Sequence, residues 1–168
     1  MTDDREIERT AEQWTYPYMA GALDFGSHMK VSMKSRDDMK HGVEIEPQII
    51  FHNTDPGVIG FMDDFCMEHG LSPRMRIKEK TNRLEIGRRD DIRDLLYLLR
   101  PFVLARAPVV EIFLEDLLPG LDRGLISTED GLIELAGYID EIREHTPQRS
   151  DVKYTQDYFK EKFSDTNR

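Results

Sequence analysis

The chain has 168 residues, of which 39% are hydrophobic and 33% are charged, and its formal net charge is −10. This composition is typical of a folded globular protein and excludes a disordered one. No apolar run approaches the roughly 18 residues that a membrane span needs, and the acidic start MTDDREIERT predicts no secretory signal. The one cysteine, Cys66, excludes an intrachain disulfide and indicates a reducing, cytoplasmic location.

The charged residues give a net negative charge, and arginine is more frequent than lysine among the cations. Asp and Glu number 33 against 23 Lys and Arg, and the chain has 15 Arg but only 8 Lys. An acidic, lysine-poor surface suits a protein that works in concentrated salt, so a halophilic source is one hypothesis. An ordinary acidic cytoplasmic protein is the alternative.

Residues 12–25 are predicted to form the first helix, with Pro17 near its start, where proline is tolerated. Residues 28–36 alternate strictly between apolar and polar side chains, which predicts a strand. After a polar turn, residues 43–52 form a second strand in which Pro47 marks a bulge or an edge. The next helix begins at Pro56, where Thr54 or Asp55 serves as N-cap, and stops at Gly70.

Two further strands are predicted over residues 74–80 and 83–88, joined by a short turn at Thr81 and Asn82. In the first of them, Met75 and Ile77 lie on the apolar face. From Asp90 onward the pattern is helical, and Ser127 to Asp130 resemble a capping box for the helix that follows. The resulting fold class is α+β, with four antiparallel strands and helices on one face. We predict one domain over residues 1–168, with a core at about 12–120 and C-terminal helices within 127–165.

Positive charge is concentrated in the predicted strands. Residues 28–36 and 74–88 hold nine Lys and Arg but only two acids, for a net charge of +7, so the rest of the chain carries −17. The period of two places most of these cations on one sheet face, which suits contact with phosphates and reading of the major groove. A solvated strand face without a partner is the alternative. Glu44 and Glu46 count against a continuous cationic face, and we expect them at its rim.

The segment YMAGALDFGS, residues 18–27, resembles the motif helix of the LAGLIDADG homing endonucleases. The predicted α-β-β-α-β-β-α order and the segments IIFHNTDPGVIGFM and LLYLLRPFVLARAPVVEIF are also similar to that family. Within 135–140, the string LAGYID matches the motif letter for letter better, but too few residues follow it for a second unit, and we interpret it as an ordinary amphipathic helix. The resemblance implies an antiparallel saddle-shaped sheet and extra C-terminal helices.

A single motif implies a symmetric homodimer whose motif helices pack along the two-fold axis. The small residues Ala20 and Gly21 would allow close approach of the two helix backbones. The alternative is that both residues pack inside one chain. A symmetric dimer would bind a pseudo-palindromic site in double-stranded DNA.

The resemblance also implies a catalytic site, from which this sequence departs. In the family, a second acid at the end of the motif helix binds a divalent metal, and here Gly26 stands at that position or the acid is deleted. Asp24 matches the first acid, which supports the helix end, and it is the candidate catalytic and metal residue. Asn53, with His52 as a less favoured choice, matches the polar residue that orders water, and Arg106 matches the basic residue near the scissile phosphate. Mg²⁺ is the implied cofactor if the protein is active.

The leading interpretation is a sequence-specific binder of double-stranded DNA in which nuclease activity is weak or lost. The alternatives are an active Mg²⁺-dependent homing endonuclease and a protein-interaction module that kept the fold but lost DNA binding. The five histidines show no spacing typical of metal ligands. The residues expected on DNA are Lys30, Ser32, Lys34, Arg36, Gln48, Arg74, Arg76, Lys78, Lys80 and Arg83, with Arg149 and Lys153 on flanking phosphates.

Overall fold

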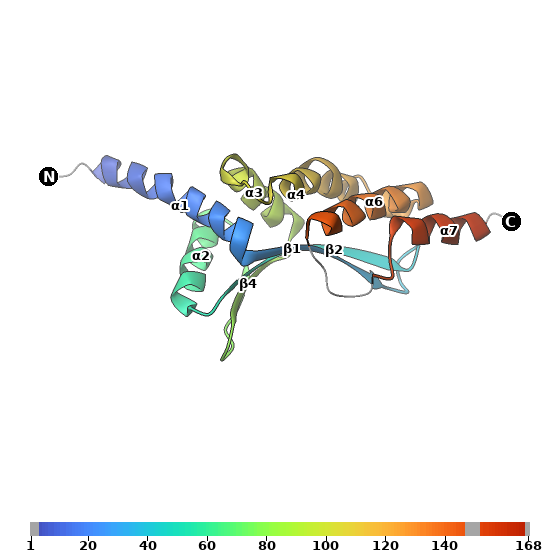
Figure 1. Cartoon of the computed structure of the whole chain (residues 1–168), viewed down its shortest axis with the longest axis horizontal. Coiled ribbons are helices and arrows are strands. Elements are labelled where there is room, and N and C mark those ends of the chain that lie inside the picture. The colour runs from blue at the N-terminus through green and yellow to red at the C-terminus, as the bar shows by residue number, and fades with distance from the viewer. Residues whose placement is uncertain (1–3, 147–151, 167–168) are drawn as a thin grey trace. The chain divides into compact units, whose positions relative to one another are not determined.

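The computed structural model describes residues 4–146 and 152–166, and it confirms the α+β class. A four-stranded antiparallel sheet has the strand order β1-β2-β4-β3 (Figure 1). The elements in chain order are α1 Asp4–Gly26, β1 Ser27–Ser35, β2 Val43–Asn53, α2 Pro56–Glu68, β3 Arg74–Arg76, β4 Asn82–Ile86, α3 Arg89–Leu99, a 3₁₀ turn η1 Arg100–Phe102, α4 Ala107–Glu111, a π-helical segment η2 Ile112–Leu117, α5 Leu118–Asp122, a 3₁₀ turn η3 Leu125–Ser127, α6 Glu129–His145 and α7 Gln156–Thr166.

The chain forms two compact units. The first comprises residues 1–28 and 49–107, and the second comprises residues 29–48 and 108–168. Strands β1 and β2 contribute residues to both units. The single domain over residues 1–168 stays a prediction.

In the first unit, β4 lies between the end of β2 and the short β3. The β2–β4 register runs from Ile49 opposite Ile86 to Asn53 opposite Asn82. Pro47 precedes the first of these pairs, at a point where β2 has no β4 neighbour and a missing N–H is tolerated. The core of this unit is built from Met19, Leu23, Ile49, Phe51, Ile59, Phe65, Leu84, Ile86, Ile92 and Leu95.

Helix α2 begins as the sequence predicts. The Asp55 carboxylate accepts the Gly57 N–H at 2.8 Å, and Pro56 occupies the first helical position. Cys66 lies buried on this helix, and burial raises the pKa of its thiol to about 12. The thiol is therefore inert at neutral pH.

In the second unit, helices α4 to α7 lie on one side of the β1–β2 hairpin (Figure 1). The Arg36 N–H donates to the Gly42 carbonyl at 2.9 Å and closes the turn, in which Gly42 has a φ of 72°. Helix α6 contains the LAGYID string and buries its apolar side, which confirms that this string is an ordinary amphipathic helix. The core of this unit is built from Val31, Val43, Ile45, Val110, Phe113, Leu117, Leu121, Leu132, Leu135, Ile139 and Phe159.

Three local predictions are wrong. Helix α1 begins at Asp4 rather than residue 12, so Pro17 lies in its interior and not near its start. Thr128, not Ser127, caps α6, because its hydroxyl accepts the Gly131 N–H at 3.1 Å. Strand β3 ends at Arg76, and Met75 and Ile77 are 43% and 63% exposed instead of forming an apolar face. The β3–β4 hairpin projects from the first unit (Figure 1), so the apolar side chains of β3 have no described element to pack against.

Candidate DNA-binding and catalytic site

Asp24 is a buried carboxylate at the end of α1, and both its oxygens are occupied. Oδ2 accepts the Leu104 N–H at 2.9 Å, and Oδ1 accepts the Arg106 N–H at 2.8 Å. These bonds satisfy two N–H groups of the connection between η1 and α4. Asp24 therefore holds this connection against the helix end, which is the supporting role that the resemblance implies for the first acid.

Gly26 closes α1, and β1 starts at once with Ser27. The Ser27 hydroxyl donates to the Leu23 carbonyl at 2.6 Å and satisfies one of the last helical carbonyls. Gly26 is exposed, and a Cβ added there would meet no atom within 4 Å. An acid would fit at this position, but the chain does not supply one.

The other residues expected in the catalytic site also have structural contacts. The Asn53 Oδ1 accepts the Asp55 N–H at 2.8 Å, which prepares the start of α2, and Arg106 is tied to Asp24 through its backbone. Within residues 4–146 and 152–166, no group of three His, Cys, Asp or Glu side chains is arranged to hold a metal. The described side chains of a single copy of the chain therefore do not supply the several oxygen ligands that Mg²⁺ prefers.

Two features of this region were not predicted from the sequence. The rings of His28 on β1 and His52 on β2 pack edge to face, with centroids 4.9 Å apart. Asn82 is buried beside Asn53, and its Nδ2 donates to the Thr54 carbonyl at 3.2 Å. Its Oδ1 has no hydrogen-bond partner among the described residues. The signal for the histidine pair was its position on the polar face of both strands.

The β3–β4 hairpin carries the exposed positive charge of the first unit. Arg74 lies opposite Glu85, and Arg76 lies opposite Arg83. Two acids offset this group: the Glu85 carboxylate lies 3.6 Å from the Arg76 Nε, and Glu79 is exposed in the connection between the strands. Lys78 and Lys80 lie in the exposed connection between the strands and not on β3 as predicted. The exposed cations of the hairpin are Arg74, Arg76, Lys78, Lys80 and Arg83.

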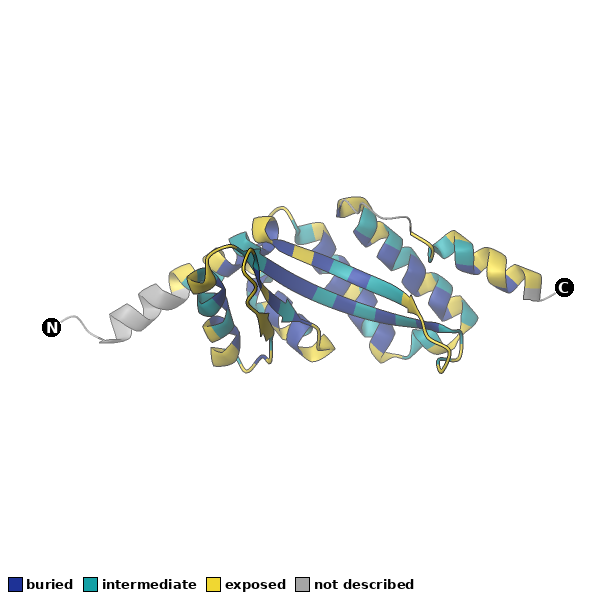
Figure 2. Cartoon of the chain, turned by 90° about the horizontal axis from the view of Figure 1, so that it is seen from below, coloured by how far each residue is buried: buried dark blue, intermediate teal, exposed yellow. Residues whose placement is uncertain are grey.

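The outer face of the β1–β2 hairpin differs from the cationic face expected from the sequence. Alternation places Lys30, Ser32, Lys34 and Gln48 away from the core. Figure 2 shows buried and less buried residues alternating along the two long strands. The structure corrects the place of the acids: they lie among the cations rather than at the rim.

Two acids of β2 pair with the cations of β1. The Lys34 Nζ donates to Glu46, and the Arg36 guanidinium donates to Glu44 and, at 2.9 Å, to Asp38. The hydrogen bond that Lys34 donates to Glu46 raises the pKa of Lys34, and the one that Arg36 donates to Asp38 raises the pKa of Arg36. This face is therefore charge-balanced.

The two small residues of the motif helix differ in burial within one chain. Ala20 is fully buried against its own chain, whereas Gly21 is half-buried and a Cβ there would meet nothing within 4 Å. Among the residues of this helix whose burial is described, from position 13 onward, the large exposed ones are Trp14, Tyr18 and Phe25, the last 86% exposed. Their spacing with Gly21 follows one side of an α-helix. Trp14 and Tyr18 also pack on Phe61 of α2, at centroid distances of 5.4 and 5.3 Å.

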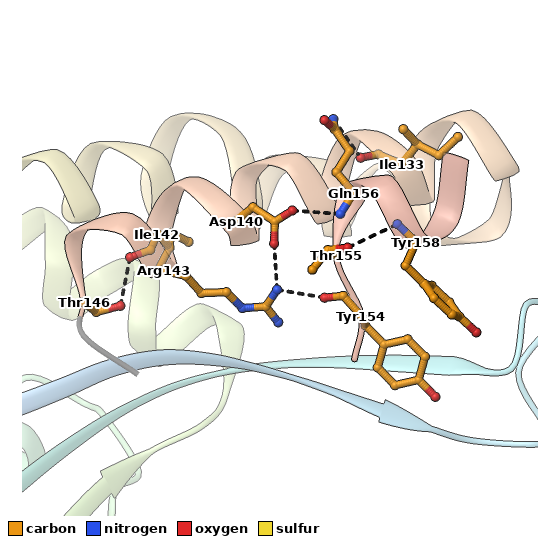
Figure 3. A network of polar contacts seen from close by, with 9 residues as sticks. All are labelled: Ile133, Asp140, Ile142, Arg143, Thr146, Tyr154, Thr155, Gln156 and Tyr158. Carbon is orange, nitrogen blue, oxygen red and sulfur yellow. Dashed lines mark hydrogen bonds and ion pairs between the residues drawn. The ribbon is translucent and has the colours of Figure 1, made fainter. Parts of the chain in front are cut away.

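The C-terminal helix is held by a polar network (Figure 3). The Asp140 carboxylate accepts from Arg143 Nη1 and from the Gln156 N–H, both at 2.7 Å. Arg143 Nη1 also donates to the Tyr154 carbonyl at 2.8 Å. Lys153 precedes this anchor and is exposed, with its Nζ 5.1 Å from the centre of the Tyr154 ring. Arg149, the other residue expected on flanking phosphates, lies outside the described residues.

The four-stranded sheet, the motif helix with Asp24 in its last turn and the C-terminal helices define the LAGLIDADG homing endonuclease fold. Homing endonuclease I-CvuI, solved in complex with a DNA target, superposes with a TM-score of 0.79 at 13% identity, covering 94% of this chain and 98% of that chain. The archaeal intron-encoded I-Vdi141I, complexed with DNA, gives 0.78 at 17% identity over 93% and 98%. I-CeuI, a group I intron-encoded homing endonuclease also complexed with DNA, gives 0.72 at 18% identity over 87% and 74%.

No family model and no curated protein sequence matches this chain. The likeness is thus one of fold, carried by the backbone and not by sequence identity. Within the described part of the chain, no helix has both the length and the apolar character to cross a membrane.

Proposed function

We propose that this chain is a sequence-specific double-stranded-DNA-binding protein of the LAGLIDADG type whose nuclease activity is weak or lost. The observation that carries DNA binding is the β3–β4 hairpin, which exposes five cations on a chain of net charge −10. Such a β-ribbon fits the major groove, and its Lys and Arg side chains contact phosphates. The DNA-bound states of I-CvuI, I-Vdi141I and I-CeuI support the assignment.

A homodimer is part of this proposal. At Phe25, the face of α1 that carries Gly21 and Phe25 is not covered by any described part of its own chain, and a second copy would bury it. We now place Gly21 and Phe25 at the contact, with Ala20 packing behind them inside its own chain. I-CpaMI and I-GzeII are matched over only 53% and 51% of their lengths, so each of these two proteins has about twice the length of the segment that matches this chain. A symmetric pair would recognise a pseudo-palindromic duplex.

The end of α1 supports the proposal that nuclease activity is weak or lost. The resemblance places the metal-binding acid where this chain has Gly26, and Asp24 is engaged by two backbone N–H groups. A two-metal phosphodiester cleavage needs carboxylates that face the reacting oxygens. Mg²⁺ is expected to be a cofactor only in the alternative of an active enzyme, in which Asp24 would have to leave these bonds and act with Asn53 and Arg106.

A protein-interaction module that has lost DNA binding is a second candidate. The observation that favours it is the charge-balanced β1–β2 face, where Glu44 and Glu46 occupy the partners that phosphates would need. The cytoplasmic location and the halophilic source stay proposals from composition. In about 1 M salt the screening length is only about 3 Å, so base contacts would have to supply more of the affinity.

The test is a binding selection on a random duplex library at several salt concentrations, with and without Mg²⁺. An enriched site without cleavage supports the proposal, and its affinity is expected to fall with salt in proportion to the phosphates contacted. Lys78→Glu with Lys80→Glu should weaken binding to every sequence, whereas Arg123→Glu, an exposed change on another element, should not. Mg²⁺-dependent double-strand breaks would establish the active enzyme. No binding at any salt would leave the interaction module.

A further inference from the structure

The outer face of the β1–β2 hairpin carries two cross-strand ion pairs, which we call rungs. One rung is Lys34 with Glu46, and the other is Arg36 with Glu44. In each rung the cation comes from the β1 side and the acid comes from β2. Asp38 adds a second acid to the Arg36 rung. Each rung thus presents hydrogen-bond donors and acceptors side by side to the solvent.

A G·C base pair presents the complementary arrangement in the major groove. Guanine offers O6 and N7 as acceptors, which Arg or Lys reads, and cytosine offers its N4 amino group, which Glu or Asp accepts. Thymine has no donor there and carries a methyl group instead. A rung whose two charges cancel gains little from contact with phosphates. Its most favourable partner on a duplex is therefore the edge of a base pair that offers both hydrogen-bond acceptors and a donor.

The spacing of the rungs also fits stacked base pairs. Outward residues two apart on a strand are about 6.6–6.8 Å apart. Base pairs of B-DNA rise about 3.4 Å per step, so two steps span about 6.8 Å. Lys34 and Arg36 are such neighbours, as are Glu44 and Glu46. Two rungs can therefore face two base pairs that are separated by one intervening pair.

The rungs are also able to open. The Lys34 and Glu46 side chains are 58% and 35% exposed, and those of Arg36 and Glu44 are 46% and 27% exposed. Exposed ion pairs contribute little to stability because water solvates the separated charges nearly as well. The two side chains of a rung can therefore separate and contact base edges while the hairpin keeps its fold.

We propose that the two rungs read G·C base pairs two steps apart in the major groove, with Arg36 and Lys34 on guanine and Glu44 and Glu46 on cytosine. This inference rests on the proposed DNA-binding function and names the base pairs that its β1–β2 hairpin selects. In a symmetric dimer the same two positions recur in each half of the target.

The experiment compares duplex libraries selected without Mg²⁺ by the full chain and by Glu44→Gln and Glu46→Gln variants. Gln pairs with adenine, so each variant is expected to change the preference at one position from G·C to T·A, with adenine in the place of cytosine, by about tenfold or more. Glu68→Gln, an exposed change on α2, is the matched control and should select the same site as the unchanged chain.

The outcomes separate this inference from the proposed function. A change of preference confined to one position per variant supports it. Affinity that rises equally for all sequences with unchanged preference overturns it, because the acids would then only repel phosphates. If the unchanged chain selects no duplex at all, the DNA-binding function fails. Circular dichroism of each variant shows whether the fold is retained, and Lys34→Gln offers a second route to the same position.

Discussion

The carboxylate of Asp24 fixes the backbone of Arg106. One oxygen accepts the Arg106 N–H at 2.8 Å, and the other accepts the Leu104 N–H at 2.9 Å. The residue that stands at the first acid of the family motif is thus engaged in holding the connection between η1 and α4. The same two bonds explain why the side chain is buried although it carries a charge, since buried carboxylates need hydrogen-bond donors.

Replacing Asp24 with Asn should lower the free energy of unfolding by about 1–3 kcal/mol. The amide keeps one acceptor oxygen but turns its own N–H₂ toward the second backbone N–H, which is left unsatisfied. Denaturant titration measures the loss. Asp37→Asn, an exposed change in the β1–β2 turn, is the matched control and should stay within about 0.5 kcal/mol. Equal stability of the two variants would contradict the supporting role of Asp24.

Gly26→Asp is expected to produce or increase Mg²⁺-dependent cleavage of the selected duplex. The added side chain meets no atom within 4 Å and supplies the carboxylate that this end of α1 lacks. Cleavage of a supercoiled plasmid carrying the target, followed with and without Mg²⁺, measures it. Gly26→Asn has the same size without the charge and should remain inactive. Equal cleavage by both variants would show that charge at this position does not limit the reaction.

If the chain forms the proposed homodimer, Phe25→Asp should convert it to a monomer and weaken binding to the full palindrome more than binding to one half-site. The side chain is 86% exposed in one chain, and an acid there would be buried against its own copy across the two-fold axis. Light scattering after gel filtration measures the mass. Met67→Asp changes a 61% exposed residue on α2 and should leave the mass unchanged. A monomeric unmodified chain would refute the dimer before any variant is made.

Cys66 should resist alkylation in the folded protein and react readily once the chain unfolds. Burial raises the pKa of its thiol from 9.0 to about 12, so almost no thiolate is present at pH 8. The neutral thiol is favoured by folding; its contribution to stability is therefore complete below about pH 9 and is lost as the pH rises toward 12. Unfolding free energies measured from pH 8 to 11 should fall more steeply for the unchanged protein than for Cys66→Ala.

Asp140→Ala should loosen α7. The variant removes the acceptor for the Gln156 N–H and leaves Arg143 with the Tyr154 carbonyl alone (Figure 3). We expect a loss of about 1–3 kcal/mol in local stability, seen as faster hydrogen exchange of the α7 amides. Glu141→Ala, the exposed neighbour, is the matched control. Unchanged exchange in α7 would mean that Phe159 and Phe163 anchor this helix without the polar network.

The sequence predicted the α+β class, the strand order along the chain and the start of α2, because these depend on local period and capping. The length of β3 was not predictable, since alternation at Met75 and Ile77 shows that one face is apolar but not that another element covers it. The beginning of α1 and the interior position of Pro17 were missed because a tertiary context tolerates proline inside a helix more often than local propensity suggests.

The candidate site was predicted only in part. The position of Asp24 followed from the motif, but its two backbone partners lie in a connection that no local pattern joins to α1. The rungs were missed because alternation places Glu44 and Glu46 on a face without giving the register that sets each opposite a cation. The contact of His28 with His52 depends on the same cross-strand geometry.

Because each rung is formed by side chains alone, its polarity is independent of the backbone that carries it. Exchanging Lys34 and Glu46 would leave the attraction between them unchanged while reversing which strand offers the donor. The selected base pair would then invert from G·C to C·G without a cost to folding. When a base pair of the DNA target changes by point mutation, substitution of the two residues of one rung can restore recognition. The stability of the protein depends little on those two residues, so such a change of specificity does not require a compensating change in the fold.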